Sequence, residues 1–188
     1  MGRAACFVAL VMAFTSTPVS AAQVNSWINP TSGNWDQALN WSLGVLPDSS
    51  QSVLITNSVW KAVAINSSTP INFPGSMTLS NLTIRGAWDT ENSLLLNYFG
   101  TAMPLTVLNG VRLQDSARIL NFNSALVVQG GTIVVTNGQL VQDGGFVRTT
   151  IGCGGVFCSM NAALLCPGSV VLAYLLEPGT CGRVANRL

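Results

Sequence analysis

The segment LTVLNGVRLQDS at residues 105–116 recurs as IVVTNGQLVQDG at residues 133–144, with identical Val, Asn, Gly, Gln and Asp at matching places. A fainter copy, MTLSN at residues 77–81, precedes LTVLN at residues 105–109 by the same spacing. Asn81, Asn109 and Asn137 therefore recur with one period. Short apolar segments that end in Asn-Gly and repeat at fixed spacing are typical of a chain that winds into stacked coils.

Stacked coils account for both parts of the repeat. Each coil returns a β-strand to the same position above the previous one, and all coils share one apolar interior. Asn and Gly tolerate the positive φ that a corner requires. We therefore expect an all-β fold, a right-handed parallel β-helix (solenoid), in which Asn81, Asn109 and Asn137 form a ladder of turn residues. An antiparallel β-sandwich stays the alternative, because a period of this length can also describe a pair of hairpins.

Short apolar runs rich in β-branched residues fill the chain between residues 23 and 150, separated by Gly, Asn, Ser, Thr and Pro. None of them carries helical periodicity over the length of a typical helix, which favours strands throughout. The expected strands cover residues 52–56, 77–84, 93–97, 105–108, 125–128 and 132–135.

The N-terminus has the features of a secretion signal. Arg3 precedes an apolar run over residues 4–14, and small residues follow as far as Ala21 and Ala22, after either of which cleavage is expected. The run is too short to span a membrane. We therefore predict a signal peptide over residues 1–22, a β-solenoid domain over 23–150 and a Cys-containing apolar tail over 151–188, in a protein that is secreted or held at the cell surface.

Charge is scarce in this chain. Lys and Arg total 8, Asp and Glu total 7, and there is no His. Nucleic-acid binding has no electrostatic basis here, and catalytic arrangements that need His are excluded. Once the signal with Arg3 is removed, the side-chain charges cancel, which favours a protein that assembles or lies on a surface. We expect no cofactor, no metal and no membrane contact beyond export, and as partners a cell-surface polysaccharide or other surface proteins.

A Trp-rich block opens the predicted solenoid, with GNW at residues 33–35, NWS at 40–42, and Ala38, Gly44 and Pro47 at intervals around them. At these residues the chain resembles the start of exported bacterial β-solenoid proteins, those related to autotransporter passengers and autotransporter-associated β-strand repeats. The resemblance covers about residues 26–150. It implies a secreted or surface protein with a structural or adhesive role.

Trp27, Trp35 and Trp41 in this block have two interpretations. They could close the open end of the first coil, where a solenoid would otherwise expose its apolar interior, as an N-terminal cap. Alternatively, exposed indole rings could stack on sugars and bind a glycan. The spacing of Trp60 and Trp88 favours no ligand over packing.

Carboxylates are the candidate catalytic groups, because glycan hydrolysis needs an acid and a base or nucleophile. Asp89 and Glu91 lie two apart on one strand face, Asp115 and Asp143 lie one repeat apart, and Asp89 precedes Asp115 by slightly less than one repeat, so the acids could line up along adjacent coils. The sequences Gln-Asp-Ser and Gln-Asp-Gly around Asp115 and Asp143 are also ordinary turns. We therefore expect no catalytic residue, with these four acids as the candidates if there is one.

The four cysteines after residue 22 all lie in the tail: Cys153, Cys158, Cys166 and Cys181. In an exported protein they could form two disulfides, with three possible connectivities. Their spacing matches no standard zinc site.

These patterns together predict an exported, non-catalytic structural or adhesive β-solenoid module of a bacterial surface or secreted protein. The alternative is a β-helix protein that binds or degrades a polysaccharide.

Overall fold

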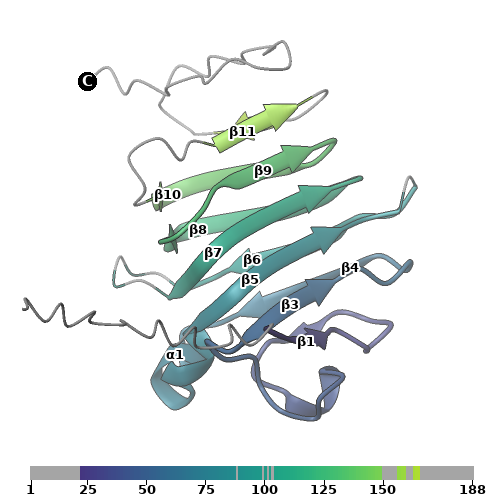
Figure 1. The fold of residues 1–188 in the computed structure, drawn as a ribbon, viewed down its shortest axis with the longest axis vertical. Helices are drawn as coiled ribbons and strands as arrows, with labels where there is room; N and C mark the ends of the chain where they lie inside the picture. Colours follow the sequence, from purple (N-terminus) through teal and green to yellow (C-terminus); the bar gives the residue numbers. More distant parts are fainter. Residues whose placement is uncertain are drawn as a thin grey trace, which may run out of the picture.

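The computed structural model describes residues 22–87, 89–98, 100, 102, 104–149, 156–159 and 163–165 (Figure 1). The signal peptide predicted for residues 1–22 lies, except for its last residue, outside them. Where the chain is described it is mostly β-strand, and all pairs of neighbouring strands run parallel. The strands are β1 (Gln23–Ser26), β2 (Gly33–Asn34), β3 (Gln51–Ile55), β4 (Lys61–Ile65), β5 (Thr78–Arg85), β6 (Asn92–Leu96), β7 (Leu105–Gln114), β8 (Ala117–Val128), β9 (Ile133–Thr136), β10 (Gln139–Thr149), β11 (Val156–Ser159) and β12 (Ala163–Leu165).

Short helices occur only in the connections of the described chain. They are the α-helix α1 (Ser68–Asn72) and the 3-10 helices η1 (Ala38–Asn40) and η2 (Pro74–Met77). Within the described residues, no helix has the length and apolarity needed to cross a membrane.

Each strand pairs with the strand two further along the chain, so the sheet curls on itself (Figure 1). The odd-numbered strands β1 to β11 form a first row, and the even-numbered strands β2 to β12 form a second row. A third row arises because long strands continue around a corner: the start of β7 pairs with the end of β8, which pairs with the end of β10. The all-β parallel fold predicted from the repeat is therefore confirmed, and the alternative of an antiparallel sandwich is wrong.

The core lies inside the curled sheet and follows from the alternation of side chains along each strand. In both β3 and β4 every second residue is buried. Buried residues of successive coils stand in register, as in the column in which Val53 pairs with Leu82, Leu82 with Val111, and Val111 with Ile133. Each such side chain contributes about 1.5–3 kcal/mol by leaving water. The repetition of small strands thus builds one continuous apolar interior.

All the expected strands are found, most of them within a residue or two of their predicted bounds. The structure also contains strands that the sequence did not predict, namely β1, β2, β4, β10 and the first half of β8. β4 begins with Lys61, which is fully buried, and a Lys at an interior position obscures the apolar alternation of the sequence. The predicted absence of long helices between residues 23 and 150 is confirmed where the chain is described, since α1 covers only Ser68–Asn72.

The period of the sequence repeat holds in the early coils, between β1 and β3 and at the start of β5 and β7, where Thr78 pairs with Thr106. Further along the chain, Val111 pairs with Ile133, so the period has become shorter. The coils shorten at two places: the connection between the first and second rows falls from residues 86–91 to 115–116, and the connection over residues 97–104 between β6 and β7 has no counterpart in the next coil, where β8 continues around its corner as one strand. The predicted alignment of residues 105–116 with 133–144 is therefore wrong as a structural register, although both segments contain strands.

The predicted ladder of turn residues is accordingly wrong for Asn137. Asn81 and Asn109 do share a corner, where both donate hydrogen bonds to Ser80 Oγ, at 3.1 and 2.9 Å. Asn137 lies at another corner, where its carbonyl oxygen accepts the backbone N–H of Ser116 at 2.7 Å. Of the three, only Asn137 has the positive φ that the sequence pattern predicts, at 54°. Recurrence of Asn in the sequence therefore does not say which corner the residue occupies or which backbone conformation it adopts.

The described parts of the tail add to both rows. β11 pairs with β9 and β12 with β10, so the parallel pairing extends beyond residue 150. Cys153, Cys166 and Cys181 lie outside the described residues, as does the side chain of Cys158, so the predicted disulfides stay a prediction.

Candidate functional site

The Trp-rich block lies in the first coil, and its three indoles are buried. Trp27, Trp35 and Trp41 are exposed by 2%, 0% and 1%. Trp41 meets Trp27 and Trp35 edge to face, with ring centroids 5.1 and 4.9 Å apart, and its Nε1 donates to the carbonyl oxygen of Trp35 at 2.8 Å. Rings without free faces cannot stack on sugars, so the glycan-binding interpretation of these three residues is wrong.

The four candidate acids do not form a line. Asp115 follows β7 at the corner between the first and second rows, whereas Asp143 pairs with Phe122 near the middle of β10. Glu91 is held by Arg118, whose Nη1 lies 2.9 Å from Glu91 Oε2, and Asp89 is exposed. The predicted alignment of acids along adjacent coils is wrong because it assumed a constant coil length.

Lys61 is the most unusual buried polar residue of the described chain. Its Nζ donates to Asn92 Oδ1 at 3.0 Å, to the carbonyl oxygen of Asn57 at 3.0 Å and to that of Val59. Burial lowers the pKa of this amine below its usual value, because desolvation disfavours the charged form. The amine joins the second and third coils through Asn92, and no carboxylate contacts it among the described residues.

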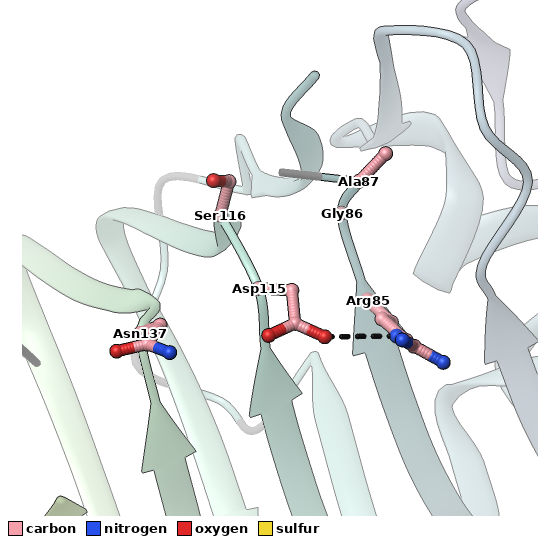
Figure 2. Close-up of a pocket in the computed structure, with 6 residues that line it drawn as sticks. All are labelled: Arg85, Gly86, Ala87, Asp115, Ser116 and Asn137. Atoms are coloured by element: carbon pink, nitrogen blue, oxygen red, sulfur yellow. Dashed lines mark hydrogen bonds and ion pairs between the residues drawn. The ribbon is translucent and has the colours of Figure 1, made fainter. Parts of the chain in front are cut away.

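Loops of unequal length connect the first row to the second, and we call this edge of the sheet the loop corner. Its connections are residues 27–32, 56–60, 86–91, 115–116 and 137–138. The first three are long and the last two are short, and the change after β5 leaves a step on the surface. A cleft of about 410 Å³ lies at this step, lined by Arg85, Gly86, Ala87, Asp115, Ser116 and Asn137 (Figure 2).

Three of the lining side chains stand side by side because they follow neighbouring strands. Arg85 ends β5, Asp115 follows β7 and Asn137 follows β9, and Figure 2 shows Asp115 between the other two. Arg85 Nε lies 2.9 Å from Asp115 Oδ2, with the two side chains exposed by 60% and 40%. Parallel strands are about 4.8 Å apart, which sets the spacing of this polar row.

The backbone of the cleft has an uncommon conformation. Asp115, Ser116 and Asn137 all have positive φ, at 48°, 66° and 54°. A Cβ on Gly86 would overlap the carbonyl oxygen of Asp115 on the next coil, so glycine is required there. Positive φ in residues other than Gly is uncommon, and such conformations cluster at functional sites and tight turns.

The cleft offers polar groups that the protein itself leaves unpaired. Among the described residues, neither Arg85 Nη1 and Nη2, nor Asp115 Oδ1, nor the side chains of Ser116 and Asn137 have a hydrogen-bond partner. Donors and acceptors are thus both available. No group of three or more metal-ligating side chains occurs in the described part of the chain.

The sequence patterns singled out Asp115 and Asn137 but gave no sign of Arg85 and Ser116 as their neighbours. They also gave no role to Trp60, which is 58% exposed on the preceding long loop. The sequence signal for Asp115 was a turn, which is where it lies. Trp88 lies outside the described residues.

In comparisons with known proteins, no family model, no curated protein and no solved structure matches this chain.

Proposed function

We propose that this protein is an exported, non-catalytic structural or adhesive module of a bacterial surface, built as a right-handed parallel β-helix with a Trp-rich N-terminal cap. The hand follows from the general rule that parallel β crossovers are right-handed in about 98% of cases. The observation that carries the proposal is the continuous parallel pairing of the two rows, in which each coil is the template for the next. Such a fold holds its surface rigid over its length.

The buried polar side chains support a structural role, since they join one coil to the next. Asn25 Nδ2 donates to Gln51 Oε1 at 2.9 Å, and Lys61 reaches Asn92 in the same way. On its own coil, Asn121 Oδ1 accepts the backbone N–H of Ser124 at 3.1 Å. Its Nδ2 also donates to the carbonyl oxygen of Phe146 on the next coil, at 3.2 Å. These contacts stabilise stacking, which is what a passive scaffold needs.

Export is supported by the N-terminal segment that the sequence predicts to be a secretion signal, and by the resemblance to exported solenoid proteins described above. The exposed apolar residues are in keeping with a surface that meets other molecules, because large apolar groups in water favour contact. They include Leu39 and Ile71, exposed by 89% and 72%. An alternative role in polysaccharide degradation gains nothing from the acids, which are dispersed or held in ion pairs.

The test is to produce the full chain in a bacterial host and follow where it goes and what it does. We expect cleavage after Ala21 or Ala22, recovery outside the cytoplasm, and greater adherence of cells that display the protein to coated surfaces. Leu94→Asp, which places a charge in the core, is the matched control that should abolish adherence. Cytoplasmic retention, unaltered adherence, or turnover of a polysaccharide by the purified chain would each refute the proposal.

A further inference from the structure

The loop corner combines a polar cleft with an exposed aromatic side chain on the loop beside it. Trp60 ends the 56–60 loop, and this loop is fastened to the 86–91 loop that forms the cleft wall. Thr90 Oγ1 donates to the carbonyl oxygen of Ser58 at 2.8 Å, and the backbone N–H of Lys61 donates to that of Glu91 at 3.2 Å. Ala87, which lines the cleft, bonds in turn to Thr90 through both backbone groups. The loop that carries Trp60 is therefore joined directly to the loop that forms the cleft wall.

The charges of the cleft favour a neutral ligand. Arg85 and Asp115 form an ion pair, so their formal charges cancel, and Ser116 and Asn137 add none. An anion or a cation would meet one favourable and one unfavourable partner in the cleft. A neutral polar ligand meets no such opposition.

The hydrogen-bonding groups favour a ligand rich in hydroxyls. A hydroxyl both donates and accepts, so it can donate to Asp115 Oδ1 while a neighbouring hydroxyl accepts from Arg85 or Asn137. Hydrogen bonds to the charged members of such a set are stronger than those between neutral groups. Adjacent hydroxyls on a sugar ring have this arrangement of donors and acceptors.

The exposed apolar groups of the loop corner favour the same ligand. Trp60 is 58% exposed and its neighbour Val59 53%, on the loop before the cleft, and Ile28 is 55% exposed on the loop before that. The C–H face of a sugar ring packs on an indole, since an aromatic ring offers a flat apolar surface with little conformational entropy to lose. A chain of sugars could thus contact the indole and the polar row together.

We propose that the loop corner binds a neutral polysaccharide, with Arg85, Asp115 and Asn137 bonding its hydroxyls and Trp60 packing on a sugar face. This inference rests on the proposed adhesive function and gives it a ligand class. The sugar-stacking role that the sequence suggested for the buried Trp27, Trp35 and Trp41 is assigned here to the exposed Trp60.

The experiment is affinity electrophoresis of the purified full chain through gels that contain cellulose derivatives, starch, mannan or β-1,3-glucan. We expect at least one of these neutral polysaccharides to retard the protein, and Asp115→Asn and Trp60→Ala each to weaken the binding by about tenfold, the loss of one charge-assisted hydrogen bond or of a comparable contact. Asn tolerates the positive φ of residue 115, so the first variant keeps the turn.

Two matched controls separate the site from the rest of the surface. Arg148→Gln removes an exposed charge from the third-row part of β10, which does not line the cleft, and Leu39→Ala removes the most exposed of the large apolar side chains described. Both should bind like the parent chain. Circular dichroism and thermal unfolding confirm that all four variants fold.

Failure takes two recognisable forms. If none of the polysaccharides retards the parent chain, or if Asp115→Asn and Trp60→Ala bind as well as the controls, the inference is wrong. If cells that display the protein still adhere to uncoated or protein-coated surfaces in that case, the adhesive function stands without this site. If adherence is also absent, both fall.

Discussion

Replacing Trp41 by Ala tests whether the Trp-rich block is part of the core. The side chain is 1% exposed and lies edge to face between two other indoles. Truncation of a buried Trp costs about 3–5 kcal/mol, and the loss of the Nε1 bond leaves the carbonyl of Trp35 without its partner at a further cost of about 1–3 kcal/mol. The expected loss of about 4–8 kcal/mol approaches the whole stability of a domain, about 5–15 kcal/mol.

In a stack of coils the damage should be local before it is global, because each coil contacts only its neighbours. Hydrogen exchange followed by mass spectrometry should therefore show lost protection in β1 and β2 and weakened protection in β3, while β8 keeps its protection. Urea unfolding of the same protein gives the total change. Trp41→Phe keeps a ring but loses the hydrogen bond, and should fall between Trp41→Ala and the parent chain.

Trp60→Ala is the matched control, since Trp60 is exposed and its removal should change the unfolding free energy by no more than about 0.5 kcal/mol. The reasoning is refuted if Trp41→Ala unfolds like Trp60→Ala, or if protection is lost evenly along the chain. Either result would mean that the first coil does not hold its indoles in the core.

Three further predictions concern the polar interior and the corners. The buried amine of Lys61 has a lowered pKa, so between that pKa and about 10.5 the folded state binds fewer protons than the unfolded state. The free energy of unfolding should therefore rise with pH across this window. Thermal unfolding curves of Lys61→Met should lack that rise. Gly131→Ala should lower the melting temperature by several degrees, because the added Cβ would overlap the backbone carbonyl of Asn109. Gly75 has open space around it, so Gly75→Ala should leave the melting temperature unchanged. Equal melting temperatures for the two variants would contradict the close approach of the coils. Asn121→Ala should cost roughly 2–4 kcal/mol in urea unfolding, since it leaves backbone groups of two coils unpaired, and a loss below about 0.5 kcal/mol would show that water replaces it.

Much of the fold could be predicted from local patterns in the sequence. Alternating apolar residues with β-branched side chains predicted the strands, because the two faces of a strand differ every second residue. The recurrence of strand and Asn-Gly turn predicted stacked parallel coils. The local pattern failed at β4, where Lys61 occupies an interior position and is satisfied by Asn57, Val59 and Asn92, two of them on its own coil's loop and one on the next coil.

The candidate site was predictable only in fragments. Asp115 was recognised as a turn residue, but its partner Arg85 lies one whole coil earlier, and nothing local indicates that the two meet. Which residues share a corner depends on the length of each coil, and that length falls when the loops shorten. The sequence left open whether the indole of Trp27 packs or faces water, and the same for Trp60; the structure buries Trp27 in the first coil and exposes Trp60.

The sequence by itself determined the class of structure, because strand formation and turn formation depend on residues close together in the chain. The tertiary structure decided which indoles face water, where each carboxylate lies and that a cleft forms at the step between long and short loops. These properties arise from the pairing of residues a whole coil apart, such as Asn121 with Gln142 and Lys61 with Asn92, and that register is fixed by the packing of whole coils. No short stretch of sequence contains it.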